Sequence, residues 1–281
     1  MLNNMLRIWT SALMLANAFC VLASPVAKRA LSNVEGARIE TAARLAMAAY
    51  GDPALCSAVI PGTKILSRFT SPLGQRGYIA KVPSLKTVVI QFTGTSNFQN
   101  AVSDEQFLPI SLNSADCGTG CLGYSGAVLN YRDAKRATNS FAAAFNALEA
   151  GYTLTITGHS LGGAVAAIAG VDLPADFLIT FGEFRVGNPA TARFIDQKYG
   201  SNTYRVVHAL DSVPAIVPRT INNQHHGRAF LLAGTTLSSL SECSSAESLK
   251  CDGGVNSADH LLYFVPTSSC GLTDPTRGIT V

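Results

Sequence analysis

The sequence is poor in charged residues, has a single tryptophan and carries little excess of either charge. Lys and Arg number 21 against 18 Asp and Glu. Three of the cations, Arg7, Lys28 and Arg29, lie within the first 29 residues, which contain no acid, so the rest of the chain is balanced. Nucleic-acid binding needs clustered excess Lys and Arg. The balance therefore excludes nucleic acid as the expected partner and favours an uncharged substrate.

No hydrophobic run is long enough to cross a membrane. The longest apolar stretch, residues 8–22, falls short of the roughly 20 residues that a spanning helix requires. It follows one cation, Arg7, and precedes the small residues Ala23 and Ser24. This layout is typical of a secretory signal peptide, with a membrane anchor as the alternative. We therefore predict a signal peptide over residues 1–23, no transmembrane segment in the mature chain, and an extracellular location.

A dibasic pair, Lys28-Arg29, stands directly before Ala30. Such a pair is a site for a secretory-pathway protease but also occurs by chance, so a propeptide over residues 24–29 stays open. The remaining residues, 30–281, are long enough and apolar enough to bury one large core. We predict that they form one domain and a monomer.

The cysteine count points to disulfides. Cys20 lies in the predicted signal peptide, which leaves an even number in an exported chain, and this favours three disulfides. Zinc is the alternative for Cys117 and Cys121, but no second close pair with metal-ligand spacing accompanies them. No metal is expected. The remaining cysteines are Cys56, Cys117, Cys121, Cys243, Cys251 and Cys270.

Hydrophobic spacing predicts an alternation of strands and helices. Periods of three to four residues indicate helices, and runs of β-branched residues indicate buried strands. The alternation predicts an α/β fold with a mostly parallel sheet and helices on both faces. The predicted helices are 35–50, 124–149, 161–170 and 188–199, and the predicted strands are 63–69, 78–82, 87–92, 152–158, 176–182 and 204–210.

One short motif carries nucleophile chemistry. Gly158-His159-Ser160-Leu161-Gly162 matches G-x-S-x-G, the turn that lifts a serine out of a sheet on a strained backbone. The bare pattern is common, and a tight turn with a buried serine is the alternative. Here a β-branched strand ends at the first glycine and a helix of small residues starts after the serine, which is the context that the motif needs. Ser160 is the predicted nucleophile.

A serine hydroxyl needs a base to take its proton and a carboxylate to orient that base. In a fold of this type the order along the chain is serine, acid, histidine. Three histidines follow the predicted acid, and His260 is preferred because it lies in a late loop between Cys251 and Cys270. His225 and His226 remain alternatives.

Asp211 is the predicted acid because it directly follows the strand 204–210, at the end of the strand where such sheets place their sites. Asp172, Asp176 and Asp196 lie in less suitable places, two in a loop entering a strand and one within a helix. Asp259 is adjacent to His260 in sequence, and neighbouring side chains seldom point at each other.

The reaction also needs two donors for the oxyanion. The backbone N–H of Leu161 is one predicted donor. Thr95, just after the strand 87–92, is the second, with an ordinary polar turn as the alternative reading.

Taken together, these residues resemble the fungal class 3 lipase family, whose members include acylglycerol lipases and feruloyl esterases. The resemblance implies an α/β-hydrolase fold, the triad Ser160, Asp211 and His260, the oxyanion residues Thr95 and Leu161, and no cofactor. It is carried by the segments FTGTS (92–96), TITGHSLGG (155–163), TFGEFRVGN (180–188), HALDSVP (208–214), HG (226–227) and DHLLYF (259–264).

The resemblance also implies a disulfide pairing, which the sequence alone leaves open: Cys56 with Cys270, Cys117 with Cys121, and Cys243 with Cys251. It further implies that residues 96–110 form a lid over the acyl pocket, whose motion gates substrate entry. Within and beside that lid, we expect Phe98, Phe107 and Leu108 to contact substrate.

Two residues depart from the family pattern. Ala101 stands in the lid where many family lipases have tryptophan, and Phe184 replaces the proline that usually precedes Arg185. The lid is also fairly polar. These features weaken the expectation of action at an oil–water interface, and several stretches look closer to the feruloyl esterase branch.

The predicted function is hydrolysis of a small or lipid carboxylic ester, first a lipase acting on acylglycerols and, as the alternative, a feruloyl or cinnamoyl esterase acting on plant cell-wall esters. A peptidase is a further alternative, because triad chemistry occurs on several folds. A noncatalytic binding module would be expected to lack a triad member, whereas all three are present.

Overall fold

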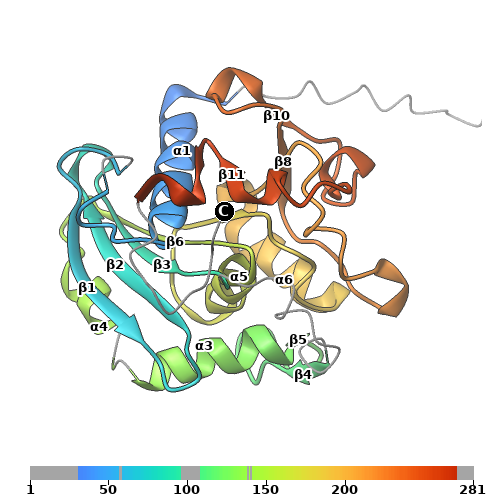
Figure 1. Cartoon of the computed structure of the whole chain (residues 1–281). Coiled ribbons are helices and arrows are strands. Elements are labelled where there is room, and N and C mark those ends of the chain that lie inside the picture. The colour runs from blue at the N-terminus through green and yellow to red at the C-terminus, as the bar shows by residue number, and fades with distance from the viewer. Residues whose placement is uncertain (1–30, 57–58, 96–107, 138, 140, 271–281) are drawn as a thin grey trace, which may run out of the picture. The chain divides into compact units, whose positions relative to one another are not determined.

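The computed structural model describes residues 31–56, 59–95, 108–137, 139 and 141–270 (Figure 1). The predicted signal peptide and propeptide, residues 1–23 and 24–29, lie outside this part of the chain. Every described residue belongs to one compact unit, which runs from Leu31 onward.

The centre of the described chain is an eight-stranded sheet in the order β1-β2-β3-β6-β7-β8-β9-β10. The five strands from β3 to β9 in this order pair in parallel, and the pairs at both edges are antiparallel. The prediction of a mostly parallel sheet is confirmed. The strands are β1 Lys64–Thr70, β2 Arg76–Val82, β3 Thr87–Phe92, β6 Thr153–His159, β7 Phe177–Phe181, β8 Thr203–His208, β9 Arg228–Leu232 and β10 Leu240–Glu242.

Helices cover both faces of the sheet, as the sequence predicted. The largest apolar cluster packs one face of the strands against α3, α4, α5 and α6, whereas α1 packs with the opposite face (Figure 1). Such double coverage explains why the parallel strands are buried along nearly their whole length. The helices are α1 Asn33–Ala48, α3 Ser125–Ala137, α4 Ala142–Asn146, α5 Leu161–Asp172 and α6 Pro189–Tyr199.

Helix α1 begins with a capping box. The Ser32 hydroxyl accepts the backbone N–H of Glu35, and the Glu35 carboxylate accepts the backbone N–H of Ser32 in return. The buried face of the helix includes Ile39, Ala43 and Ala46, which pack with side chains of β7, β8 and β9. The small side chains of Ala43 and Ala46 let the helix lie close to the sheet.

The long helix predicted over residues 124–149 is wrong, because the structure has two shorter helices there. Helix α3 ends at Ala137, and Asn139 adopts a left-handed backbone conformation with φ of 32°. Asparagine tolerates that conformation and is a poor residue for a helix interior. The apolar spacing continues across the break because α4 packs on the same core cluster as α3.

Short elements complete the described chain. The strands β4 Pro109–Ser111 and β5 Leu122–Tyr124 form one two-stranded sheet, and β11 Leu262–Tyr263 and β12 Val265–Pro266 form another. The single-turn 3-10 helices are η1 Pro83–Leu85, η3 Gly200–Asn202, η4 Arg219–Ile221, η5 Leu237–Ser239, η6 Leu249–Cys251, η7 Asp259–Leu261 and η8 Thr267–Cys270.

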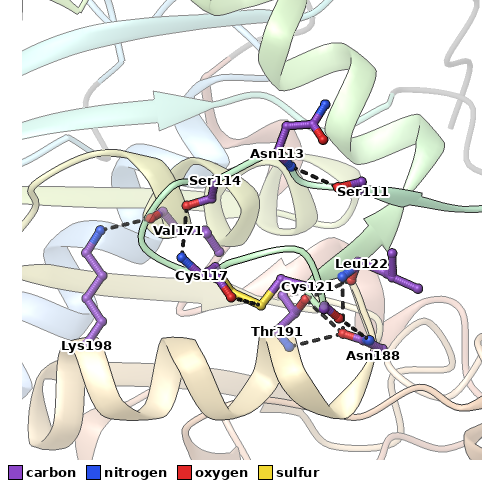
Figure 2. Close-up of a disulfide and its surroundings, with 11 residues drawn as sticks. Ser111, Asn113, Ser114, Cys117, Cys121, Leu122, Val171, Asn188, Thr191 and Lys198 are labelled. Carbon is purple, nitrogen blue, oxygen red and sulfur yellow. Dashed lines mark hydrogen bonds between the residues drawn. A yellow bond between two sulfur atoms is a disulfide. The ribbon is translucent and has the colours of Figure 1, made fainter.

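The six cysteines from Cys56 onward form three disulfides, Cys56–Cys270, Cys117–Cys121 and Cys243–Cys251. This pairing is the one that the family resemblance implied. The Cys117–Cys121 bridge closes a small loop that Asn188 fastens to the start of α6 (Figure 2). The Asn188 side chain accepts the backbone N–H groups of Leu122 and Thr191, and its amide donates to the carbonyl of Gly120.

We predict that the disulfides contribute unequally to stability. The Cys56–Cys270 bridge spans 214 residues of sequence, whereas Cys117–Cys121 spans 4. In the chain-entropy account, the longer loop loses more freedom in the unfolded state, and its bridge contributes roughly 3 kcal/mol more. Thermal unfolding should show a much larger fall in Tm for the double variant Cys56→Ser/Cys270→Ser than for Cys117→Ser/Cys121→Ser. Equal falls would contradict the prediction.

Candidate active site

The candidate nucleophile sits on a strained turn between a strand and a helix. Ser160 has φ of 59° and ψ of −130° between the end of β6 and the start of α5. The two flanking glycines are required by close packing. A Cβ at Gly158 would lie 2.1 Å from the carbonyl oxygen of Gly162, and a Cβ at Gly162 would lie 2.2 Å from the carbonyl oxygen of Phe92.

The hydroxyl of Ser160 is buried and has no hydrogen-bond partner among the described residues. The loop that follows β3 packs directly against it, because a Cβ at Gly94 would lie 3.2 Å from the Cβ of Ser160. Thr95 is the next residue along that loop and is partly exposed. Leu161 is the first residue of α5. The two predicted oxyanion residues therefore belong to separate elements, Leu161 next to the serine in sequence and Thr95 next to the glycine that packs against it.

Asp211 and His260 are 49 residues apart in sequence and form a hydrogen bond in the structure. Asp211 follows β8, and His260 lies in η7. Nδ1 of His260 is 2.9 Å from Oδ2 of Asp211 and 3.1 Å from Oδ1. The aspartate is fully buried and the histidine nearly so. Since an ionised carboxylate only accepts hydrogen bonds, Nδ1 is the donor, and Nε2 is left as the nitrogen that takes up a proton.

Sequence reasoning missed a tyrosine that supports this pair. The Tyr263 hydroxyl donates to Oδ2 of Asp211 at 2.5 Å and accepts the backbone N–H of His208. The backbone N–H of Val213 donates to the other carboxylate oxygen. Burial, followed by the neighbouring carboxylate, raises the pKa of Tyr263 well above its ordinary value, so the hydroxyl stays protonated and donates. Tyr263 is three residues after His260, within DHLLYF, and that spacing was the available signal.

Because Gly182 has no side chain, it leaves room for the contact between Asp211 and His260. Its φ is 56°, and a Cβ there would lie 2.8 Å from Oδ2 of Asp211 and 2.9 Å from Nδ1 of His260. The carbonyl of the preceding residue, Phe181, accepts the backbone N–H of Ser160. The end of β7 thus contacts both the serine turn and the acid–base pair.

The alternative histidines face other partners. Nε2 of His226 is 3.0 Å from a carboxylate oxygen of the buried Glu183. Nε2 of His225 is 3.5 Å from Asp252, and its backbone N–H donates to Glu247. Burial, together with nearby arginines, lowers the pKa of His225 well below its ordinary value. Neither histidine contacts Asp211 in the described hydrogen bonds.

The alternative aspartates have structural partners. Asp172 contacts Tyr131 and Lys135, and Asp176 accepts the backbone N–H of Leu154. Asp196 accepts the backbone N–H of Gly227. The Asp259 carboxylate accepts the backbone N–H of Leu210. Asp211 is therefore the carboxylate that meets the predicted base.

Most of the predicted lid lies outside the described residues, including Phe98, Ala101 and Phe107. Leu108 is described and is 59% exposed. Beyond it, Pro109–Ser111 forms strand β4, so the last residues of the predicted lid belong to a small sheet. The predicted lid segment 96–110 thus ends in a strand, β4, whose backbone pairs with β5.

Within the described ranges, no group of three or more His, Cys, Asp or Glu side chains is placed to hold a metal ion. The described helices are also too short or too polar to span a bilayer.

Known proteins resemble this chain over most of its length. The family described as Lipase (class 3) matches residues 89–221. "Secreted mono- and diacylglycerol lipase 1" of Fusarium solani is 28% identical over 227 residues, which cover 76% of this chain and 66% of that protein. A lipase of Rhizopus niveus is 32% identical over 236 residues, which cover 76% of this chain and 58% of that protein. The chain thus spans less than two thirds of these relatives.

Solved structures share the fold. Lipase II from Rhizopus niveus superposes with a TM-score of 0.73 at 28% identity, covering 85% of this chain and 98% of that one. A triacylglycerol lipase, described as having a serine protease triad for its catalytic centre, superposes with a TM-score of 0.70 at 25% identity and covers 86% of this chain and 99% of that one. These likenesses agree with the predicted α/β-hydrolase fold.

We predict that Tyr263→Phe lowers kcat for a soluble ester by about 10-fold, because a hydrogen bond to a buried carboxylate is worth roughly 1.5–3 kcal/mol and part of it is recovered by relaxation. KM should change little, since the tyrosine acts through Asp211. The control is Tyr78→Phe, which removes a buried hydroxyl that donates to the carbonyl of Leu45. Steady-state kinetics of both variants provide the measurement. An unchanged kcat for Tyr263→Phe would be evidence against its support of the acid.

Proposed function

Since this chain belongs to the class 3 lipase family, we propose that it is a secreted serine ester hydrolase that acts on acylglycerols. The observation that carries the proposal is the buried hydrogen bond of 2.9 Å between His260 and Asp211, beside a serine on a strained turn. That arrangement serves nucleophilic acyl transfer, and the proposed reaction needs no cofactor.

The proposed reaction proceeds in two steps. The Oγ of Ser160 attacks the ester carbonyl while its proton passes to Nε2 of His260, and the resulting imidazolium is stabilised by Asp211. When the carbon–oxygen bond to the alcohol breaks, His260 returns that proton to the leaving alkoxide. Water then attacks the acyl-enzyme with His260 again as base, which releases the carboxylic acid and restores Ser160.

The oxyanion that forms in each step needs donors already in place. We assign this role to the backbone N–H of Leu161 at the start of α5 and to Thr95 in the loop after β3. The packing of Gly94 against Ser160 supports the assignment, because it brings that loop to the serine. An N–H at the start of a helix also carries the positive end of the helix dipole.

An uncharged lipid ester fits the charge balance of the chain and the printed activities of its relatives. We assign Phe98, Phe107 and Leu108 to contact with the acyl group. Secretion is supported by the three disulfides and by the relative described as secreted. We also propose that the protein is a monomer.

We predict that Ser160→Ala lowers kcat by about 10⁴-fold or more, because removal of a nucleophile leaves only binding and oxyanion stabilisation. The matched control is Ser71→Ala, a buried serine whose hydroxyl accepts the backbone N–H of Gln75. Both variants should melt within a few degrees of the parent, and only Ser160→Ala should be inactive. Ester hydrolysis retained by a folded Ser160→Ala protein would contradict the proposed mechanism.

A substrate panel distinguishes the lipase from the feruloyl esterase. We expect emulsified acylglycerols to be hydrolysed with a higher kcat/KM than methyl ferulate, measured at the same pH and enzyme concentration. Ser160→Ala serves as the blank for both substrates. The reverse preference would move the assignment to the aromatic ester, and release of peptides from casein without ester hydrolysis would overturn both.

A further inference from the structure

The turn that carries the candidate base is held by two imidazoles. Nε2 of His159 is 2.8 Å from the backbone carbonyl oxygen of His260, and Nδ1 of His208 is 3.0 Å from that of Asp259. A carbonyl oxygen only accepts hydrogen bonds, so both ring nitrogens are donors. His159 and His208 are the last residues of β6 and β8, the two strands that flank β7.

We propose that His159 and His208 are positioning residues that clamp the backbone of η7, and that Tyr50 fixes His159 for this role. The inference rests on the proposed function, since the group being positioned is the general base His260. None of the three side chains is assigned contact with substrate. They act through the turn that they hold.

Tyr50 determines which nitrogen of His159 carries the proton. Its hydroxyl is 2.7 Å from Nδ1 of His159, and both side chains are buried. Because Nε2 of a neutral His159 is committed as the donor to His260, Nδ1 must accept, and the Tyr50 hydroxyl donates to it. Burial, followed by the charge of Asp211, raises the pKa of Tyr50, so that hydroxyl remains protonated. The hydrogen bonds run in one direction, from Tyr50 through His159 to the His260 carbonyl.

His159 remains neutral beside the base. Burial lowers its pKa well below the ordinary value, and the nearby His260 lowers it further. The ring centroids of His159 and His260 are 4.3 Å apart, and the Tyr263 ring lies 5.3 Å from that of His159. Among the described residues, the titratable groups in contact with His159 are Tyr50, His260 and Tyr263. A neutral imidazole places no second cation next to His260 when the base takes up the serine proton.

The same chain of hydrogen bonds touches the loop that leads to Thr95. A Cβ at Gly94 would lie 2.2 Å from the Tyr50 hydroxyl and 2.6 Å from the carbonyl oxygen of His159. The turn after α1, the serine turn, the base turn and the loop after β3 therefore meet at one point. We expect displacement of one of these elements to shift the others.

Two substitutions at His159 test the clamp. The amide of glutamine reaches the position of Nε2 and donates, whereas leucine does not. We expect His159→Leu to lower kcat for a soluble ester by about 10- to 100-fold with KM nearly unchanged, since small misplacement of a catalytic group costs about this much. His159→Gln should recover most of the lost kcat. The proposal is overturned if His159→Leu and His159→Gln lose the same amount of kcat and show the same fall in Tm, because the loss would then reflect reduced stability.

Tyr50 provides a second test that preserves the size of the side chain. Tyr50→Phe removes the hydroxyl that orients His159, and we expect kcat to fall about 10-fold. The matched control is Tyr199→Phe, which removes a buried hydroxyl donating to the carbonyl of Gly170, away from the base turn. If Tyr50→Phe keeps the parent kcat, Tyr50 does not fix His159.

His208 keeps the proposal testable if leucine at position 159 prevents folding. Its donor is Nδ1, whose place the amide of asparagine takes, so His208→Asn should retain more kcat than His208→Leu. Ser160→Ala distinguishes failure of the proposed function from failure of the clamp. Activity in Ser160→Ala contradicts the proposed function itself, whereas an inactive Ser160→Ala with parental kcat in the His159, His208 and Tyr50 variants contradicts only the clamp.

Discussion

The buried carboxylate of Asp211 is the group around which the candidate site is arranged. An ionised carboxylate is costly to remove from water unless donors replace its hydration. Asp211 receives three, from His260, Tyr263 and the backbone of Val213. Two of these donors lie in one short segment around η7, so the same carboxylate that orients the base also fixes the place of that segment on the sheet. The carboxylate therefore contributes to folding as well as to the chemistry.

Buried charge elsewhere supports the same segment. Arg185 follows the site glycine Gly182 by three residues and donates to Glu247 and to Asp252, just before the chain returns to the site. The backbone N–H of Gly254 then donates to the carbonyl of Asp211. Ion pairs of the buried Arg185 thus link the disulfide loop 243–251 to the candidate site. Buried charges of this kind need partners because the surrounding interior has a low dielectric.

The sequence predicted the alternating strands and helices because apolar periodicity records which faces are buried, and the five-residue G-x-S-x-G motif located the candidate serine. It did not predict the roles of His159, His208, Tyr50 or Tyr263. Their contacts connect residues at the ends of β6 and β8 and in the turn after α1 to the segment around η7. These residues are far apart in sequence, and the local spacing of apolar residues carries no information about such long-range contacts. The break at Asn139 was missed for a related reason: α3 and α4 share one core, so the apolar spacing runs through the turn that separates them.

The disulfide Cys56–Cys270 joins the two chain regions that supply Tyr50 and His260. Ribosomal synthesis delivers residue 160 long before residue 260, and the bridge forms only after residue 270 has been made and the thiols have met an oxidant. In the proposed mechanism, a nascent chain therefore carries the nucleophile before its base, and the site can form only after synthesis has passed residue 260.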